Sequence, residues 1–209
     1  MKKETRVPKQ KRSIEKSEKI IEVAYQLFTD NGYFNTSTVD IAKAADLSVG
    51  VVYSYFSDKK DILMVCLERF EDYFMENIYQ EIRSTQSIEA IEDIVDITKH
   101  MILVIVKTHT SQKRRYHDEV KALELLDTDV KNHFLKIQNS LMDAFKSRLS
   151  FYGYHLSYPD EQAFLIHQMI SGIEDEVVFQ DIIDINHDVL IEQCAIAIKN
   201  MLVKDKECQ

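Results

Sequence analysis

The stretch that most constrains the fold is residues 36–60, where two short amphipathic helices are predicted on either side of a tight turn. In residues 38–45, small and apolar side chains recur three residues apart, which predicts two turns of helix with one buried face. Thr38 is the predicted N-cap, because a threonine hydroxyl can accept a hydrogen bond from a free N–H of the first turn. The stripe predicted to face inward is Val39, Ala42 and Ala45.

The second short helix is predicted over residues 49–55, after a polar break that Ser48 can close as a cap. Val52 and Phe56 lie four residues apart and are predicted to face inward. The residues left on the outer face are Val49, Gly50, Tyr53 and Ser54. Two short helices that cross over such a break have the spacing of a helix-turn-helix.

A longer helix is predicted before this stretch, over residues 13–31, and Gly32 stands where a helix commonly ends. Its predicted buried stripe is Ile20, Ile21, Ala24, Leu27 and Phe28. Residues 1–12 show no apolar period and contain Pro8, so we expect a mobile basic arm. Such an arm either solubilises the chain or follows a nucleic-acid backbone into a minor groove, and both explanations stay open.

Composition predicts an all-α fold for the whole chain. The 209 residues include only four Gly and two Pro, and Val, Ile and Thr show no convincing alternation. Further helices are predicted over 61–83, 88–106, 116–126, 130–151, 159–183 and 187–203. The last two are apolar on more than one face and therefore need a second partner. We expect two domains, residues 1–60 with the helix-turn-helix and arm, and residues 61–209.

The net charge of −9 argues against nucleic-acid binding until it is divided along the chain. Residues 1–60 hold eleven Lys and Arg against eight Asp and Glu, net +3, which leaves fifteen against twenty-seven, net −12, for residues 61–209. Salt screens charges over about 10 Å, so a basic face can attract phosphates although the rest of the chain is acidic.

The chain shows none of the sequence signals of export or membrane insertion. Its first residues lead into no apolar segment, and no apolar run approaches the length of a membrane span. The three cysteines, Cys66, Cys194 and Cys208, are odd in number and irregularly spaced, which fits a reducing compartment. We therefore expect a soluble cytoplasmic protein without membrane contact.

The first part of the chain also carries a dense resemblance to a known family. The matching positions are Glu18, Lys19, Ile20, Ile21, Ala24, Leu27, Phe28, Gly32, Ser48, Gly50, Tyr53, Tyr55, Phe56 and Lys59. In this spacing they resemble the N-terminal domain of TetR/AcrR-type transcriptional regulators. The resemblance implies a DNA-binding helix-turn-helix domain followed by a helical ligand-binding and dimerisation domain.

By this resemblance, the residues that would touch DNA lie on and beside residues 49–55. The implied backbone contacts are Thr38, Tyr53, Tyr55 and Lys59, the implied base contacts are Val49 and Gly50, and Ser48 and Ser54 add polar groups.

The chain departs from the family at Asp46, Val49 and Val51, where Gly, a polar residue and Thr are usual. Asp46 tolerates a left-handed turn. The two valines cannot donate hydrogen bonds, which leaves Val49 to press on a thymine methyl group.

Lys59 has a second argument, independent of the resemblance. Ser57 or Asp58 is predicted to cap the next helix, which places Lys59 and Lys60 in its first turn. The helix dipole disfavours a cation there by roughly a few tenths of a kcal/mol. A phosphate would compensate Lys59, whereas neighbouring aspartates explain Lys60 about as well.

The resembled family usually encloses a small molecule among its middle helices. The candidate residues for a small hydrophobic or amphipathic ligand are Phe70, Phe74, Met101, Tyr116, Phe134, Phe145 and Met169. Aromatic side chains at helical spacing more often belong to a plain core, and that alternative stays open. Acidic residues would suit a cationic ligand if they were buried, although solvated faces explain them more simply: Glu119, Glu124, Glu174, Asp175 and Glu176.

The resemblance further implies a homodimer, in which the last two helices, about 159–183 and 187–203, pair across a two-fold axis. The two reading helices would then reach half-sites about 34–36 Å apart on DNA. A ligand that shifts the 61–83 helix would change this separation and release a palindromic operator. Repression rather than activation rests on the resemblance alone.

Two other classes of function stay in view. The seven histidines are scattered, with no HExxH, no GxSxG and no glycine-rich phosphate loop, so we expect no enzyme, no cofactor and no metal. Two interpretations of Cys66 stay open, a redox role and a simple packing role as a buried side chain. The remaining alternative is a helical interaction module, or a ligand-binding protein whose helix-turn-helix is only a packing unit. Positive potential on the face of Ser48, Tyr53 and Lys59 would argue against it.

Overall fold

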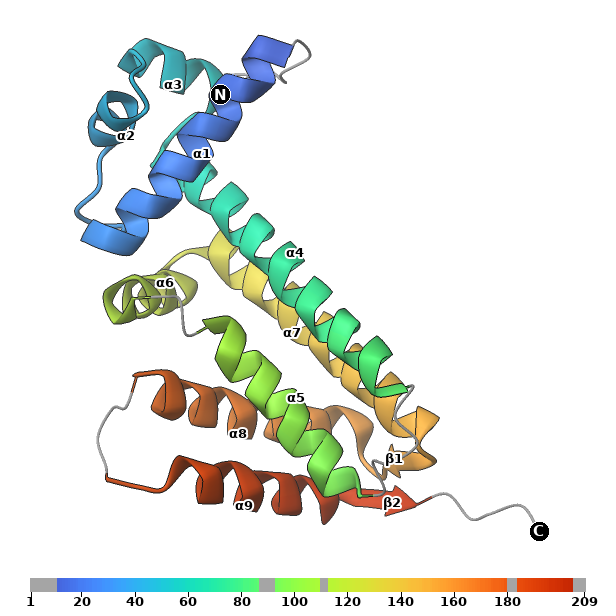
Figure 1. Cartoon of the computed structure of the whole chain (residues 1–209). Coiled ribbons are helices and arrows are strands. Elements are labelled where there is room, and N and C mark those ends of the chain that lie inside the picture. The colour runs from blue at the N-terminus through green and yellow to red at the C-terminus, as the bar shows by residue number, and fades with distance from the viewer. Residues whose placement is uncertain (1–10, 87–92, 110–112, 180–183, 205–209) are drawn as a thin grey trace. The chain divides into compact units, whose positions relative to one another are not determined.

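The structure is a computed structural model that describes residues 11–86, 93–109, 113–179 and 184–204 (Figure 1). Its helices are α1 (Lys11–Asn31), α2 (Thr38–Ala44), α3 (Val49–Tyr55), α4 (Lys59–Gln86), α5 (Ile94–His109), α6 (Arg114–Leu126), α7 (Thr128–Phe151), α8 (Pro159–Phe179) and α9 (His187–Lys199). Two short strands, β1 (Tyr154–Leu156) and β2 (Leu202–Lys204), complete the described elements. The predicted all-α fold is confirmed, with one small antiparallel ladder that the sequence did not indicate.

The chain forms two compact units. The first spans Met1–Tyr73 and Gln112–Lys131, so it takes in α1 to α3, the first part of α4, and α6. The second spans Phe74–Ser111 and Asn132–Gln209, with the rest of α4, α5, α7 to α9 and both strands. α6 therefore packs with α1, far from it in sequence. The domain boundary after residue 60 stays a prediction.

The side chains that pack α1, α2 and α3 together are apolar and buried. They are Ile20, Ile21, Ala24, Phe28, Ile41, Ala42, Ala45, Val52 and Phe56. The predicted inward direction of Val52 and Phe56 and the predicted helix over 49–55 are thus confirmed. The prediction that Val39 faces inward is wrong, since its side chain is 57% exposed. α2 buries Ile41 instead, which lies about 200° round the helix from Val39.

Ser37, not Thr38, caps α2. The Asp40 N–H donates to Ser37 Oγ at 3.2 Å, and the Ser37 N–H donates to the Asp40 carboxylate at 2.9 Å. This reciprocal capping box satisfies two backbone donors at once, and it is available only where an acid stands three residues after the cap. The bonds from the Ser37 side chain and backbone lower the pKa of Asp40.

Two residues with positive φ shape the connections around α2. Gly32 ends α1 as predicted, with φ of 86°, and its N–H donates to the Phe28 carbonyl at 2.9 Å. A Cβ at Gly32 would lie only 2.4 Å from a carboxylate oxygen of Glu119 in α6. Asp46, with φ of 56°, makes the left-handed turn between α2 and α3. The expected tolerance of Asp46 for this turn is confirmed.

α4 begins two residues earlier and ends later than predicted. The Asp61 N–H donates to Asp58 Oδ1 at 2.9 Å, which makes Asp58 the capping residue. The Ser57 N–H in turn donates to Asp61 Oδ2 at 2.9 Å. The helix predicted over 61–83 thus continues through Gln86. Thr85 is a weak helix former, Gln86 is a good one, and neither breaks a helix.

The second unit has one continuous apolar core. The buried members are Ile94, Ile97, Ile102, Val106, Phe145, Leu149, Leu156, Ala163, Ile166, Ile173, Ile191, Cys194 and Ile198. Between the helices predicted over 130–151 and 159–183 lies β1, which pairs antiparallel with β2 so that His155 faces Val203. The helix predicted to reach residue 203 therefore ends at Lys199. Residues 87–92 and 180–183, where two predicted helix ends fall, lie outside the described residues.

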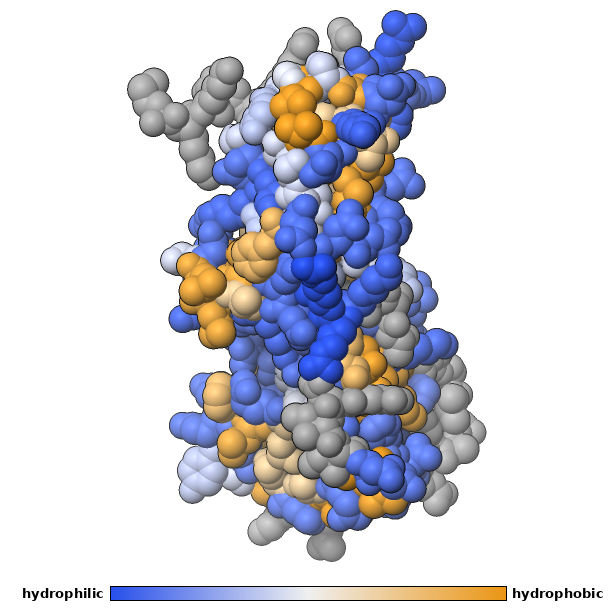
Figure 2. Space-filling model, turned by 90° about the vertical axis from the view of Figure 1, so that its left-hand side faces the viewer, coloured by the Kyte–Doolittle hydropathy of each residue, from blue (hydrophilic) through white to orange (hydrophobic). Residues whose placement is uncertain are grey.

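The surface in Figure 2 is largely hydrophilic, and its hydrophobic side chains gather in separate groups. Within the described part of the chain, none of the helices combines the length and the apolar character that a bilayer span requires. The helix predicted to end at residue 106 continues to His109. Residues 1–10, which hold most of the predicted arm, lie outside the described residues, whereas Lys11 and Arg12 open α1.

We predict that Gly32→Ala lowers the free energy of unfolding by about 1–3 kcal/mol, because alanine is strained at positive φ and its Cβ would meet the Glu119 carboxylate. Gly50→Ala is the matched control. Its Cβ would meet no atom within 4 Å, and alanine favours a helix by about 0.5–1 kcal/mol. Urea unfolding followed by circular dichroism measures both variants. A Gly32→Ala protein as stable as its parent would contradict the prediction.

Candidate nucleic-acid interface

The outer face of α2 and α3 is open and uneven. Val39 is 57% exposed on α2, and Tyr53 is 46% exposed on α3. Gly50 is exposed, with no atom within 4 Å of the place of its missing Cβ. The half-buried Val49 precedes Gly50 in the first turn of α3. This face offers apolar contact and space for the close approach of another molecule.

Thr38 and Tyr53 come together although fifteen residues separate them. Thr38 Oγ1 and the Tyr53 hydroxyl lie 3.0 Å apart in a hydrogen bond across the two helices. Each hydroxyl keeps further capacity, since a hydroxyl donates one hydrogen bond and accepts two. One of the two O–H protons is used in the bond between them, so the pair keeps one O–H on the exposed face that can donate to a phosphate oxygen.

The two serines of α3 differ in what they have left to offer. Ser48 stands at the N-cap position, but its side chain makes no capping hydrogen bond. Ser54 Oγ already donates to the Val51 carbonyl at 2.6 Å, so its proton is used within the helix. Ser48 is therefore the stronger candidate for donating to a phosphate or base.

Tyr55 and Lys59 are turned toward the protein. The Tyr55 hydroxyl forms a hydrogen bond of 3.0 Å with Ser13 Oγ of α1, in keeping with the expected half-buried aromatic. Lys59 Nζ donates to the Tyr33 carbonyl at 2.6 Å and stands 4.1 Å from the centre of the Tyr33 ring. Burial lowers the pKa of Lys59. Its unfavourable place in the first turn of α4 is thus compensated from within, without a phosphate.

The sequence did not single out the exposed aromatic Phe34, which stands between α1 and α2 with 53% of its surface exposed. Its N–H donates to Glu119 Oε2 at 2.9 Å, and Arg115 donates to Glu119 Oε1 at 3.1 Å. Lys113 forms an ion pair with Asp30 at the end of α1. No sequence spacing indicates the contact of Phe34 with Glu119, because 85 residues separate them.

Basic charge near this face comes mainly from α1. Its exposed cations are Lys11, Arg12, Lys16 and Lys19, and Lys43 is exposed on α2. Lys60 is committed elsewhere, in ion pairs with Asp129 at 2.8 Å and Asp127 at 2.9 Å, and these contacts raise its pKa. Described residues of α1 and α2 therefore supply the cations that a phosphate backbone would need.

Comparison with known proteins finds a family for part of the chain. The model of bacterial regulatory proteins of the tetR family matches residues 20–65, from the middle of α1 into α4. These residues form a helix-turn-helix domain of the TetR type. This family consists of regulators rather than enzymes. The matched segment contains every residue of the α2–α3 face described above.

Two curated relatives and one solved structure show the extent of the likeness. The chain is 38% identical over 68 residues to the HTH-type transcriptional regulator HbdR of Aromatoleum sp., covering 32% of this chain and 30% of that protein. It is 24% identical over 131 residues to the biofilm operon icaADBC negative regulator IcaR of Staphylococcus epidermidis, covering 60% and 65%. The matches thus span less than two thirds of these relatives.

The fold likeness extends further than the sequence likeness. The crystal structure of a transcriptional regulator from Saccharomonospora viridis, in complex with choline, has a TM-score of 0.66 and covers 91% of this chain and 99% of that chain. Its sequence identity is 16%, so this similarity concerns the fold. It supports the all-helical fold described above for both units.

The candidate ligand residues are divided between the units. In the first unit, Phe70 lines a cavity between α1 and α4, and the buried Tyr116 makes an edge-to-face contact with Tyr25. In the second unit, Phe145 belongs to the core, with Met101 and Met169 packed against it. Phe74 lies 5.1 Å from the His109 ring, and Phe134 lies 5.7 Å from the His133 ring.

Two acidic residues of the predicted set, Glu174 and Glu176, are largely buried beside histidines. Glu174 Oε1 lies 2.7 Å from His109 Nδ1, with 16% and 17% of the two side chains exposed. Burial of the His109 ring opposes protonation, but the hydrogen bond and charge of Glu174 outweigh it and raise the pKa of His109. Glu174 therefore already has a polar partner within the second unit.

Cys66 behaves as a buried side chain. Its Sγ donates to the Ile21 carbonyl at 3.8 Å, and burial raises the pKa of its thiol to about 12. A thiol that stays protonated is a poor nucleophile. Of the two interpretations of Cys66 from the sequence, the packing role has the better support.

We predict that Lys59→Met lowers the free energy of unfolding by about 1 kcal/mol, because the Tyr33 carbonyl loses its donor and the ring its cation. The salt dependence of DNA affinity should stay unchanged. A direct phosphate contact would instead reduce the slope of log K against log salt by about 0.9, and that result would contradict the inward role. Lys136→Met, at an exposed lysine of α7, is the matched control.

Proposed function

We propose that this TetR-family regulator is a dimeric repressor that binds a palindromic DNA operator through α2 and α3. The observation that carries the proposal is the Thr38–Tyr53 hydroxyl pair beside the open surface at Gly50. Paired hydroxyls suit a phosphate, and a residue without a side chain lets a base edge approach the backbone. The free Ser48 hydroxyl extends the same polar edge.

Sequence selectivity would come from few direct contacts. Val49 presents methyl groups and no hydrogen-bond donor, so it suits a thymine methyl. Val39 and Phe34 add exposed apolar surface near the same connection. Direct polar contacts to bases would therefore be sparse, and we expect much of the selectivity to come from DNA shape.

The proposed dimer uses one face of α8 together with α9. Four exposed residues of α8 lie on one face of the helix: Phe164, Leu165, Gln168 and Gly172. The last three follow Phe164 by one, four and eight residues. Phe164 is 54% and Leu165 50% exposed, and Val189 on α9 is 51% exposed. Gly172 has no atom near its missing Cβ, which leaves room for a second helix. A two-fold pairing here would bury these side chains.

Repression and ligand response rest on the relatives rather than on contacts within this chain. IcaR of Staphylococcus epidermidis is named a negative regulator, and the Saccharomonospora viridis regulator is in complex with choline. By analogy, we propose a small hydrophobic or amphipathic effector in the second unit. α4 supplies residues to both units, so a shift of α4 would reach the helix-turn-helix.

The second candidate is a helical protein in which α2 and α3 only pack. The inward Tyr55 and Lys59 favour it, since two of the implied DNA contacts serve the fold. The exposed Tyr53, Ser48 and Gly50 favour DNA binding. Protein with no preference for any genomic fragment over random DNA, in a selection at low salt, would decide for the packing unit.

We predict that Tyr53→Phe weakens binding to the operator about tenfold, because a hydroxyl facing a charged phosphate is worth about 1.5 kcal/mol. The salt slope should stay the same, since no charge is removed. Fluorescence anisotropy with DNA from upstream of the chain's own gene measures the affinity. Tyr158→Phe, at a tyrosine 68% exposed in the second unit, is the control. Equal loss in both variants would contradict a specific contact at Tyr53.

We predict that Leu165→Glu shifts the protein from dimer to monomer in sedimentation velocity. The reason is that the change places a charge in each half of the proposed apolar contact. Operator affinity should fall by at least about tenfold, because two half-sites are no longer bound together. Leu135→Glu, at a leucine 44% exposed on α7, is the matched control. A Leu165→Glu protein that remains dimeric would contradict the proposed face.

A further inference from the structure

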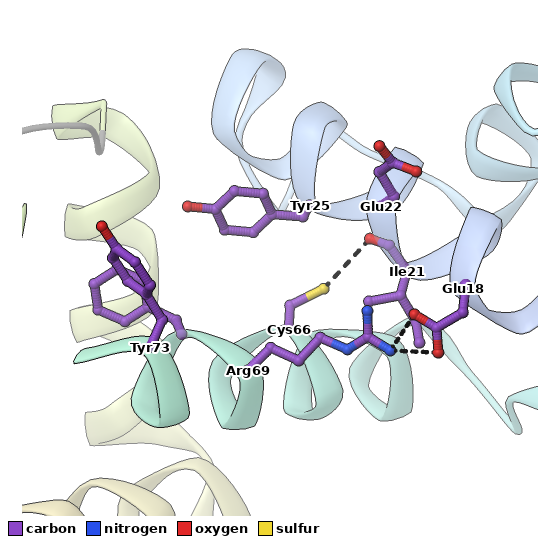
Figure 3. Close-up of a pocket in the computed structure, with 8 residues that line it drawn as sticks. Glu18, Ile21, Glu22, Tyr25, Cys66, Arg69 and Tyr73 are labelled. Atoms are coloured by element: carbon purple, nitrogen blue, oxygen red, sulfur yellow. Dashed lines mark hydrogen bonds and ion pairs between the residues drawn. The ribbon is translucent and has the colours of Figure 1, made fainter. Parts of the chain in front are cut away.

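A cavity of about 480 Å³ lies between α1 and α4 in the first unit (Figure 3). Its lining comes from Glu18, Ile21, Glu22, Tyr25, Cys66, Arg69, Phe70 and Tyr73. Neither α2 nor α3 contributes to it, so it is separate from the proposed DNA face. It also involves no residue of the second unit, where the effector is proposed. Its volume falls within the range of small-molecule sites, about 300–1,000 Å³.

The cavity is held open by contacts that tie its two helices together. Cys66 Sγ donates to the Ile21 carbonyl at 3.8 Å, and Arg69 pairs with the Glu18 carboxylate at 2.7 Å. Figure 3 shows Cys66 between the helices and the Arg69–Glu18 pair at one end. A ligand would therefore meet walls that are already in place, which reduces the entropy lost on binding.

Three aromatic rings make up much of the remaining wall. Tyr25 comes from α1, and Phe70 and Tyr73 come from α4. Tyr25 and Tyr73 lie toward the end away from the Arg69–Glu18 pair in Figure 3. The negative face of an aromatic ring attracts an organic cation within about 6 Å of its centre. Rings from both helices would thus favour a cation between them.

The charges of the lining point the same way. Arg69 is paired with Glu18, so the two cancel. Glu22 is exposed, and it forms no hydrogen bond or ion pair with the described residues. The lining therefore keeps one uncompensated negative charge beside aromatic and apolar surface. An anion would be repelled, and a neutral molecule would gain nothing from Glu22.

We propose that this cavity binds an amphipathic organic cation. Its apolar body packs against Ile21 and Phe70, and its cationic group lies between the Glu22 carboxylate and the tyrosine rings. Such a ligand would touch α1 and α4 at once, the first and last helices of the helix-turn-helix unit. The site is additional to the effector site proposed for the second unit.

The test uses the full-length protein without DNA. Isothermal titration with benzyltrimethylammonium is compared with neopentylbenzene, a neutral molecule of nearly the same shape. We expect saturable binding of the cation at about millimolar concentration, at least about threefold tighter than the neutral probe, and weakening as salt rises. Equal affinity for both probes, or no saturable binding of the cation to about 10 mM, would overturn the proposal.

Variants locate the binding. Glu22→Gln should weaken cation binding about threefold to tenfold, and Tyr73→Leu should do the same while keeping apolar bulk. Glu68→Gln and Tyr79→Leu make the same changes on α4 outside this cavity and should bind like the parent. Thermal unfolding checks that each variant is folded. Loss of binding in Glu68→Gln but not in Glu22→Gln would place the cation elsewhere. Loss in Tyr79→Leu but not in Tyr73→Leu would do the same. Because no DNA is present, failure here leaves the proposed repressor untouched.

Discussion

The close approach of Glu119 to Gly32 is the contact on which the geometry of the first unit depends. A side chain at residue 32 would occupy the place of the carboxylate, which lies 2.4 Å from an ideal Cβ. With glycine there, Glu119 can accept the Phe34 N–H at 2.9 Å. A backbone donor in the turn after α1 is thereby satisfied from α6. The direction of the chain into α2 follows from this contact.

The same turn explains why the implied DNA contacts separate into two groups. Thr36 is buried, and its hydroxyl donates to the Gly32 carbonyl at 2.8 Å. Tyr33 offers its carbonyl and ring to Lys59, which draws the start of α4 toward the turn. Lys59 therefore serves the fold. Thr38 and Tyr53, on the outer side of α2 and α3, keep their hydroxyls on the surface.

α6 gives the first unit a route of communication that α4 alone would not provide. Glu119 holds α6 to the turn before α2, and Lys60 of α4 holds the residues after α6 through Asp127 and Asp129. In each contact at least one charged side chain has little exposed area. Salt screens such a charge less than it screens a charge on an open surface. A change in the position of α6 would thus act on the helix-turn-helix at two points.

The sequence by itself determined the all-α class, the bounds of α3, the end of α1 at Gly32 and the inward Val52 and Phe56. These depend on local periodicity, capping and backbone conformation, which act within a few residues. It also indicated the family that residues 20–65 match, because the helix-turn-helix residues are contiguous. Ser37 as the cap of α2 was within reach as well, since Asp40 completes its capping box three residues later.

Only the tertiary structure decided which of the marked residues face outward. The inward direction of Lys59, the ladder of β1 with β2 and the attachment of α6 to Gly32 all join residues far apart in the chain. The cavity between α1 and α4 likewise needs both helices before it exists. Such contacts depend on packing in three dimensions, and no spacing along a single sequence encodes them locally.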